Sequence, residues 1–245
     1  MNLAVSLHPG AFPIWATLAL GFVLGLRHAL DPDHLVAVST MVSEERSLWR
    51  SSLIGVSWGL GHTASLVVFG AAIAVFRLAV TPRWSVWLEF SVGCMLVWLG
   101  VNVLRKVRQN PPLHVHSHEH DGVVHSHLHF HTGDAGHSHG HRTLKLGGRP
   151  FVVGIVHGLA GTAALTLMVV SAIPSLALAV GYLLIFGLGT IGGMIAMSVL
   201  MSVPLALAAG RFVRLERMVQ LASGLASLSF GVFLAWNVGL IQSLW

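Results

Sequence analysis

A short segment near the N-terminus, Arg27-His-Ala-Leu-Asp-Pro-Asp-His34, gathers two imidazoles, two carboxylates and one guanidinium beside apolar residues. Imidazole nitrogens combined with a carboxylate suit borderline divalent ions such as Ni²⁺, Co²⁺ or Zn²⁺, whereas Mg²⁺ and Ca²⁺ prefer oxygen ligands. Ionisable groups within an apolar span usually mark an ion path or a ligand site. The alternative is a solvated helix end at a membrane surface, but the apolar run from Leu35 to Val42 would then have no role.

The geometry of this segment depends on Pro32. In a continuous helix, His28 and His34 would point about 240° apart and could not share one ion. Pro32 has no amide hydrogen, and its ring clashes with the carbonyl of His28. A break there can bring His28, Asp33 and His34 around one centre, with Asp31 and Pro32 in support, and it frees the His28 carbonyl as a candidate oxygen ligand.

A second candidate ligand, His62, lies in the segment Trp58-Gly-Leu-Gly-His-Thr63. Glycines before it permit a close helix approach, and Thr63 is a candidate supporting residue. The alternative for His62 is a buried neutral histidine bonded to a neighbouring helix. Beside the first cluster, we favour a ligand because unpaired polar groups are costly in a membrane.

The elements that position these residues are membrane spans. Of 245 residues, 54% are hydrophobic and 9% charged, against about 25% charged in a soluble domain. No charged residue occurs from Pro150 to Gly210 or from Met218 to Trp245. The apolar blocks are long enough for helices of about 20 residues and lack the alternation of barrel strands. We therefore expect an all-α polytopic membrane protein. The lone Cys94 excludes a disulfide framework within the chain.

Six transmembrane helices are predicted. They run over about 12–42 (interrupted near Asp31-Pro32), 48–76, 84–104, 151–173, 176–209 and 215–240. This topology places eleven of the fourteen Lys and Arg residues on one side and two on the other, with Arg27 inside the first span. We expect the protein to lie in the inner membrane of the cell. The positive-inside rule then places the side with more Lys and Arg in the cytoplasm and both termini outside. Topology thus explains the basic residues, and we expect no nucleic-acid partner.

The two halves of the chain resemble each other in order and spacing. Gly25-Leu-Arg-His28 is echoed by Gly154-Ile-Val-His157, and Trp58-Gly-Leu-Gly61 by Phe186-Gly-Leu-Gly189. Gly93 and Gly100 recur as Gly224 and Gly231. Three spans in each half would make two inverted three-helix repeats, an architecture common in transporters. Shared helix-packing glycines without common descent are the alternative.

The second half keeps one candidate ligand. Its equivalents of Asp33, His34 and His62 are Thr162, Ala163 and Thr190, and only His157 matches a histidine of the first half. His157 is therefore a candidate ligand, a supporting partner or a relic, and the sequence does not choose among these three roles.

Between the halves lies a segment with eleven of the sixteen histidines, from Pro111 to Gly148. We expect residues 1–110 to form the first repeat, 111–148 a disordered cytoplasmic loop, and 149–245 the second repeat. Spaced His-x-His tracts with Gly, Ser and Asp are typical of metal-binding segments. The loop could buffer metal, deliver it to a cytoplasmic acceptor, gather it before export, or serve only as a linker. Its histidines are His114, His116, His118, His120, His125, His127, His129, His131, His137, His139 and His141.

The string His28, four residues, then Asp33-His34 resembles the signature of the nickel/cobalt transporter superfamily. Gly61-His62-Thr63 resembles its second signature, and the segment from His157 to Gly161 is similar to the shorter branch of urease-accessory-type membrane permeases. The resemblance implies selective transport of Ni²⁺ or Co²⁺, with His28, Asp33 and His34 as recognition groups. Pro32 departs from the family string, which usually has a small residue there.

We therefore expect a secondary permease that takes up Ni²⁺ or Co²⁺ as its transported substrate and needs no cofactor. Efflux by the same architecture and a metal-binding accessory protein without transport are the alternatives. No Walker-type nucleotide loop and no His-Glu-x-x-His helix occur in the sequence, so we do not expect an enzyme.

Overall fold

The first predicted span is broken at the expected place. The computed structural model describes residues 13–45, 47–76, 82–109, 115–120, 123–128, 142–160, 173, 175–208 and 213–242. Helix α1 (Ile14–His28) and helix α2 (Pro32–Val42) meet at 57°. Pro32 is the first residue of α2, where its missing amide hydrogen would have had no helical acceptor. Proline thus starts a new helix here rather than distorting a continuous one.

The remaining helices are α3 (Leu48–Phe76), α4 (Pro82–Gln109), α5 (Arg142–Ala160), α7 (Leu176–Ala208) and α8 (Val213–Trp236), which is followed by the π-helical turn η1 (Asn237–Gln242). Apart from α5, they follow the predicted spans closely. Helix α5 begins at Arg142, nine residues before the predicted fourth span and inside the segment predicted to be a disordered loop, so that prediction is wrong for residues 142–148. Four of them are long and apolar enough to cross a membrane, or five spans if the bent pair α1–α2 counts as one. The predicted fourth span continues past α5 into residues outside the described part, so the described residues contain five candidate spans rather than six.

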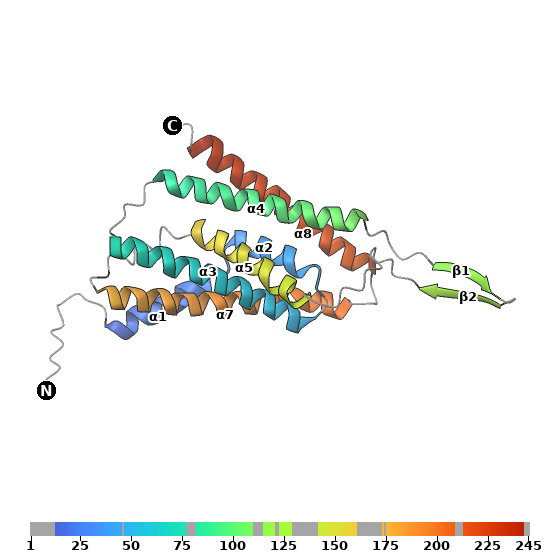
Figure 1. Cartoon of the computed structure of the whole chain (residues 1–245), viewed down its shortest axis with the longest axis horizontal. Coiled ribbons are helices and arrows are strands. Elements are labelled where there is room, and N and C mark those ends of the chain that lie inside the picture. Colours follow the sequence, from blue (N-terminus) through green and yellow to red (C-terminus); the bar gives the residue numbers. More distant parts are fainter. Residues whose placement is uncertain are drawn as a thin grey trace.

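The helices form an elongated bundle whose outer surface is apolar. The start of α1 and the end of α8 lie at one end, and α4 and α8 run side by side along one edge (Figure 1). Large apolar side chains such as Trp15, Phe69, Leu200 and Phe233 are more than half exposed. Exposed apolar groups on long apolar helices are what lipid-facing surfaces require. These features are those of a multi-pass helical membrane protein.

Helix α1 packs on α7 through glycine, and α5 packs on α3 in the same manner. A side chain at Gly25 would overlap the backbone carbonyl of Phe186, and one at Gly154 would overlap the backbone carbonyl of Trp58. Glycine lets two helix backbones approach this closely. Gly25 and Gly154 are equivalent in the predicted repeat, as are Phe186 and Trp58, so one contact occurs twice.

The contact is reciprocated from the opposite helices. A side chain at Gly189 of α7 would overlap the carbonyl of Phe22, and one at Gly61 of α3 would overlap the carbonyl of Phe151. These residues again correspond between the halves. Each interface therefore has a glycine on both helices, and neither helix can move outward without opening both contacts.

The α4–α8 pair repeats this arrangement within a single interface. A Cβ at Gly93 would lie 3.0 Å from the carbonyl oxygen of Gly231, and a Cβ at Gly100 would lie 2.6 Å from that of Gly224. Low residue numbers of α4 therefore face high residue numbers of α8, so the two helices are antiparallel. The predicted repeat makes Gly93 equivalent to Gly224 and Gly100 to Gly231.

A two-stranded hairpin occupies part of the segment that the sequence predicts to be disordered. Strands β1 (Val115–His120) and β2 (Val123–Leu128) are antiparallel, and His116 pairs with His127 in the register. The dipeptide Asp121-Gly122 between them is a strong hairpin signal, and the valines favour extended backbone. The hairpin lies beyond the end of the bundle opposite the start of α1 (Figure 1).

Candidate metal centre

The break between α1 and α2 turns His34 back toward His28. The carbonyl of His28 accepts hydrogen bonds from the backbone N–H of Asp31 (3.0 Å) and from Nδ1 of His34 (2.8 Å). The ring centroids of His28 and His34 lie 4.6 Å apart. The sequence offered this carbonyl as a ligand, but in the structure it orients His34 instead.

That bond also sets the chemistry of His34. A carbonyl only accepts hydrogen bonds, so Nδ1 of His34 must carry the proton, and Nε2 of the neutral ring has a lone pair. The His34 side chain is fully buried, and its Nε2 has no hydrogen-bond partner within the described residues. A buried, unprotonated imidazole nitrogen of this kind is ready to bind a cation.

His28 is oriented in the same way by a carboxylate. Its Nδ1 lies 2.7 Å from Oδ2 of Asp31, and its Nε2 lies 3.1 Å from Nε2 of His62 on α3. An ionised carboxylate only accepts, so Nδ1–H of His28 donates to Asp31, and Nε2 of His28 accepts from Nε2–H of His62. Carboxylate–histidine pairs of this type commonly fix the tautomer and raise the basicity of metal-binding imidazoles.

Asp33 contacts α5, a helix of the second half. Its Oδ2 lies 2.8 Å from Nε2 of the fully buried His157 on α5, and its Oδ1 accepts from the backbone N–H of His34 (3.0 Å). The rings of His34 and His157 lie 4.4 Å apart. His157 of the second half therefore lies at the centre, in contact with Asp33 and His34 of the first half.

The five predicted ligands divide into two groups of three. Imidazole nitrogens of His28, His34 and His62 all lie within 4.8 Å of one another, and so do ligand atoms of Asp33, His34 and His157. His34 belongs to both groups. The structure thus brings together all the predicted membrane ligands, from four helices that span residues 28 to 157.

The supporting residues have separate places. Asp31 holds His28, and Pro32 begins α2. Thr63 instead faces α7, where its hydroxyl donates to the carbonyl of Gly187 (3.3 Å). Thr63 is therefore part of the helix packing and belongs to neither group of three.

Sequence reasoning missed Trp58, which forms a wall of the centre. Its ring is fully buried and lies 5.4 Å from the ring of His34 and 5.6 Å from that of His157. The signal was available, because Trp58 precedes His62 by four residues and so lies on the same helix face. On the other side, Phe186 lies 5.5 Å from the ring of His28.

The histidines of the predicted loop are only partly covered by the described residues. Five of them lie in the hairpin strands: His116, His118, His120, His125 and His127. The other six, His114, His129, His131, His137, His139 and His141, lie outside the described residues.

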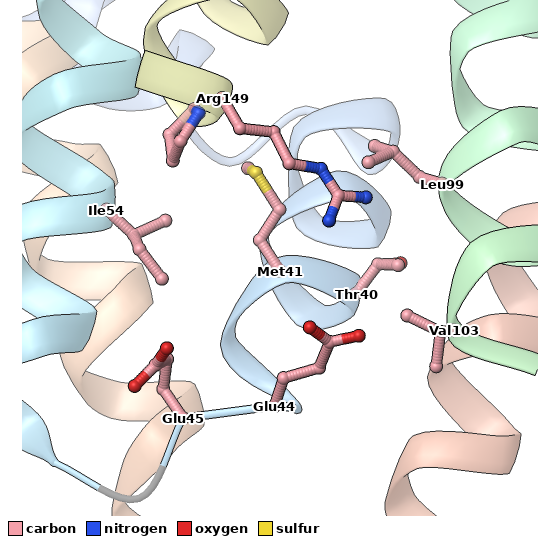
Figure 2. Close-up of a pocket in the computed structure, with 9 residues that line it drawn as sticks. Thr40, Met41, Glu44, Glu45, Ile54, Leu99, Val103 and Arg149 are labelled. Carbon is pink, nitrogen blue, oxygen red and sulfur yellow. The ribbon is translucent and has the colours of Figure 1, made fainter. Parts of the chain in front are cut away.

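A cavity of about 100 Å³ lies along α2 from the centre, between α2, α3, α4 and α5. Arg149 points into it between Met41 and Leu99, and the carboxylates of Glu44 and Glu45 approach from the opposite side (Figure 2). The guanidinium of Arg149 also lies 4.8 Å from the centre of the Trp98 ring.

The acids of this cavity have basic partners. Glu44 pairs with Lys106 at 2.5 Å, and Glu45 lies 3.9 Å from Arg50. One carboxylate oxygen of Glu44, Oε1, is buried and has no hydrogen-bond partner among the described residues. Glu44 therefore lines the cavity with one carboxylate oxygen paired to Lys106 and the other buried.

Comparison with known proteins gives a relative that matches over most of the chain. The urease accessory protein UreH of Bacillus sp. (strain TB-90) is 39% identical over 232 residues, which is 93% of each chain. Two Arabidopsis thaliana proteins, Chloroplast protein FOR GROWTH AND FERTILITY 1 and 2, are 28% and 26% identical over 72% and 70% of this chain. The chain spans 47% and 43% of the length of those two. No family model and no solved structure matches.

Proposed function

Because the chain belongs to the UreH family, the urease-accessory-type branch of the nickel/cobalt transporter superfamily, we propose that it is a secondary permease for Ni²⁺ or Co²⁺. The observation that carries the proposal is the buried centre of four imidazoles and one carboxylate at a break in a membrane span. Broken helices near the middle of the membrane form the substrate sites of many secondary transporters.

The charge of the centre supports a divalent cation as the substrate. Asp31 and Asp33 each form a hydrogen bond with a histidine, and Arg27 nearby is exposed. Two carboxylates balance the charge of one divalent ion, and the imidazoles favour Ni²⁺ or Co²⁺ over Mg²⁺ or Ca²⁺.

We further propose that the two halves are inverted repeats. Glycine contacts at successive turns make α1 parallel to α7 and α5 parallel to α3, while α3 and α7 are antiparallel. Helices α1 and α5 therefore run in opposite directions, as do α3 and α7, and α4 and α8. Each helix is thus antiparallel to its sequence equivalent, which is the relation that an axis in the membrane plane produces.

The cavity beside Arg149 is proposed as the cytoplasmic end of the path. At 1.5 Å per residue, Thr40 lies about 9 Å along α2 from His34, and Arg149 lies about 12 Å along α5 from His157. Helix α4 ends and α5 begins on this side, next to the histidine-rich segment. In this proposal, the protein lies in the inner membrane with its termini outside. The loop then buffers metal in the cytoplasm or passes it to an acceptor.

Uptake is the proposed direction. A relative named as an accessory protein of urease fits the supply of metal to an enzyme better than its removal from the cell. The same name also favours a second candidate, a membrane protein that binds metal for an enzyme without moving it. Efflux by the same centre is the third, because a site in equilibrium serves both directions.

Flux of ⁶³Ni²⁺ in proteoliposomes of known orientation tests the proposal, with Co²⁺ and Zn²⁺ as competitors. We expect saturable flux that Co²⁺ inhibits and that His28→Ala, Asp33→Ala and His34→Ala each abolish. His118→Ala, which removes the same side chain from the hairpin, is the matched control and should leave flux unchanged. Tight binding without flux would favour the accessory candidate, and normal flux in all three variants would exclude the proposed site.

A further inference from the structure

The two groups of three ligands share His34 without merging into one. The rings of His62 and His157 lie 6.4 Å apart, whereas they lie 5.2 and 4.4 Å from the ring of His34. His28 and His62 are joined by their own contact, and Asp33 and His157 by another. His34 thus stands between two pairs that are each already in contact.

Resting on the proposed function, we propose that these groups are two successive stations for one transported ion, with His34 as the ligand that the ion keeps throughout. The first station is His28, His34 and His62. The second station is Asp33, His34 and His157. Transfer exchanges two imidazoles for one imidazole and one carboxylate while the bond to His34 persists.

The orientation of His34 supports this role. Its Nδ1–H is held by the carbonyl of His28, so the lone pair of Nε2 has a fixed direction from the backbone of the helix break. That Nε2 is buried, and no described residue satisfies it. A ligand anchored in this manner can keep one ion bound while the partners on either side change.

The stations also differ in which half of the protein supplies them. All three ligands of the first station precede residue 110, so they belong to the first proposed repeat. The second station needs His157 on α5, which belongs to the second. Movement of one repeat against the other therefore preserves the first station but forms or breaks the second. The first station is the resident binding site, and the second depends on conformation.

The packing around His157 places the stations side by side. A side chain at Gly158, next to His157, would lie 2.5 Å from the carbonyl oxygen of His62 and would overlap the hydroxyl of Ser65. His157 is thus level with the His62 turn of α3, and the ion moves across the boundary between the repeats. Because Nε2–H of His157 donates to Asp33 and Nε2–H of His62 donates to His28, each of these two histidines binds the ion after a change of tautomer or through Nδ1. Neither Nδ1 atom has a partner among the described residues.

Binding and flux separate the two stations. We would measure Co²⁺ affinity and the Co²⁺ d–d absorption spectrum of the detergent-solubilised full chain, and ⁶³Ni²⁺ flux of the same variants in proteoliposomes. His62→Ala should weaken Co²⁺ binding by about tenfold or more and abolish flux. His157→Ala should change the affinity by less than about threefold and keep the spectrum, yet lower flux at least about tenfold.

His157→Gln, which keeps an amide donor near Asp33, repeats the test with less disturbance of the buried site. A monodisperse elution profile equal to that of the unmodified chain shows that a variant is folded. If both His157 variants weaken binding and change the spectrum as much as His62→Ala does, the ligands form one site and the two-station proposal is wrong. If the unmodified chain shows no flux, the permease proposal fails, while the binding comparison still decides whether His157 belongs to the resident site.

Discussion

We predict that Asp31 raises the metal affinity of His28 through a single hydrogen bond. The bond is 2.7 Å long, and the Asp31 side chain is 34% exposed. A hydrogen bond to a charged group contributes about 1.5–3 kcal/mol, and a neutral acceptor is about half as strong. With its partial exposure, we expect Asp31→Asn to cost metal binding about 1–2 kcal/mol, which raises the Kd for Co²⁺ about five- to thirtyfold.

The direction of this effect follows from the tautomer. The Asp31 carboxylate accepts from Nδ1–H of His28 and leaves its Nε2 as a metal ligand. An asparagine amide can instead donate to Nδ1, which moves the proton to Nε2 and blocks that ligand. Both the lost charge and the wrong tautomer therefore weaken binding.

Equilibrium binding of ⁵⁷Co²⁺ to the purified chain measures the change. Asp121→Asn, the same substitution between the hairpin strands, is the control and should leave the Kd unchanged. Asp31 occupies the N-cap position of α2 without a side-chain cap hydrogen bond, so the thermal unfolding midpoint should also stay constant. A lowered midpoint with an unaltered Kd would refute the reasoning, because Asp31 would then act on stability alone.

Three further predictions concern the packing, the cavity and the loop. Gly25→Ala should destabilise the fold by about 3 kcal/mol or more, because the added Cβ would overlap the backbone of Phe186. The yield of folded protein measures this loss. Gly148→Ala is the control: Gly148 has open space around it, so this variant should behave as the unmodified chain. Glu44→Gln should lower ⁶³Ni²⁺ flux about threefold or more without changing Co²⁺ affinity, because it removes a charge from the cavity but not from the centre; equal losses in both would place Glu44 at the binding site. Deletion of residues 112–140 should leave flux intact but reduce the metal that cells retain; loss of flux would make the loop part of the mechanism.

Much of the fold could be predicted because lipid imposes long apolar helices with few alternatives. The break at Pro32 followed from a local rule, since proline cannot donate a helical hydrogen bond. The helix boundaries of α3 and α7 agree with the prediction to within a residue. The hairpin could not be predicted from composition, because the composition of the histidine-rich segment indicates disorder. The only opposing signal is the dipeptide Asp121-Gly122, which indicates a turn.

The candidate site was predictable in its members but not in its pairings. Ionisable residues in apolar spans are rare enough to stand out, which identified His28, Asp33, His34 and His62 from the sequence. Which histidine contacts which is decided by helix packing over more than thirty residues of separation. The Asp33–His157 bond joins the two halves of the chain, and only the position of α5 against α2 and α3 creates it. The site as a metal site stays a prediction until metal binding is measured.

The two halves share their packing glycines but not their candidate ligands, and this difference has a physical reason. In the proposed repeat, the same glycine contact occurs in both halves, so Gly25 and Gly154 must both be small for both interfaces to close. A ligand set for one ion is needed only once. Thr190, the equivalent of His62, is fully buried and bonds its hydroxyl to the carbonyl of Phe186 (3.0 Å), so it satisfies itself within its own helix. A second complete set of carboxylates and imidazoles would place more charge and more unpaired donors at the same depth, where each is costly. In the proposed repeat, one asymmetric centre lies between two equivalent halves, and His157 on α5 joins the second half to it through Asp33.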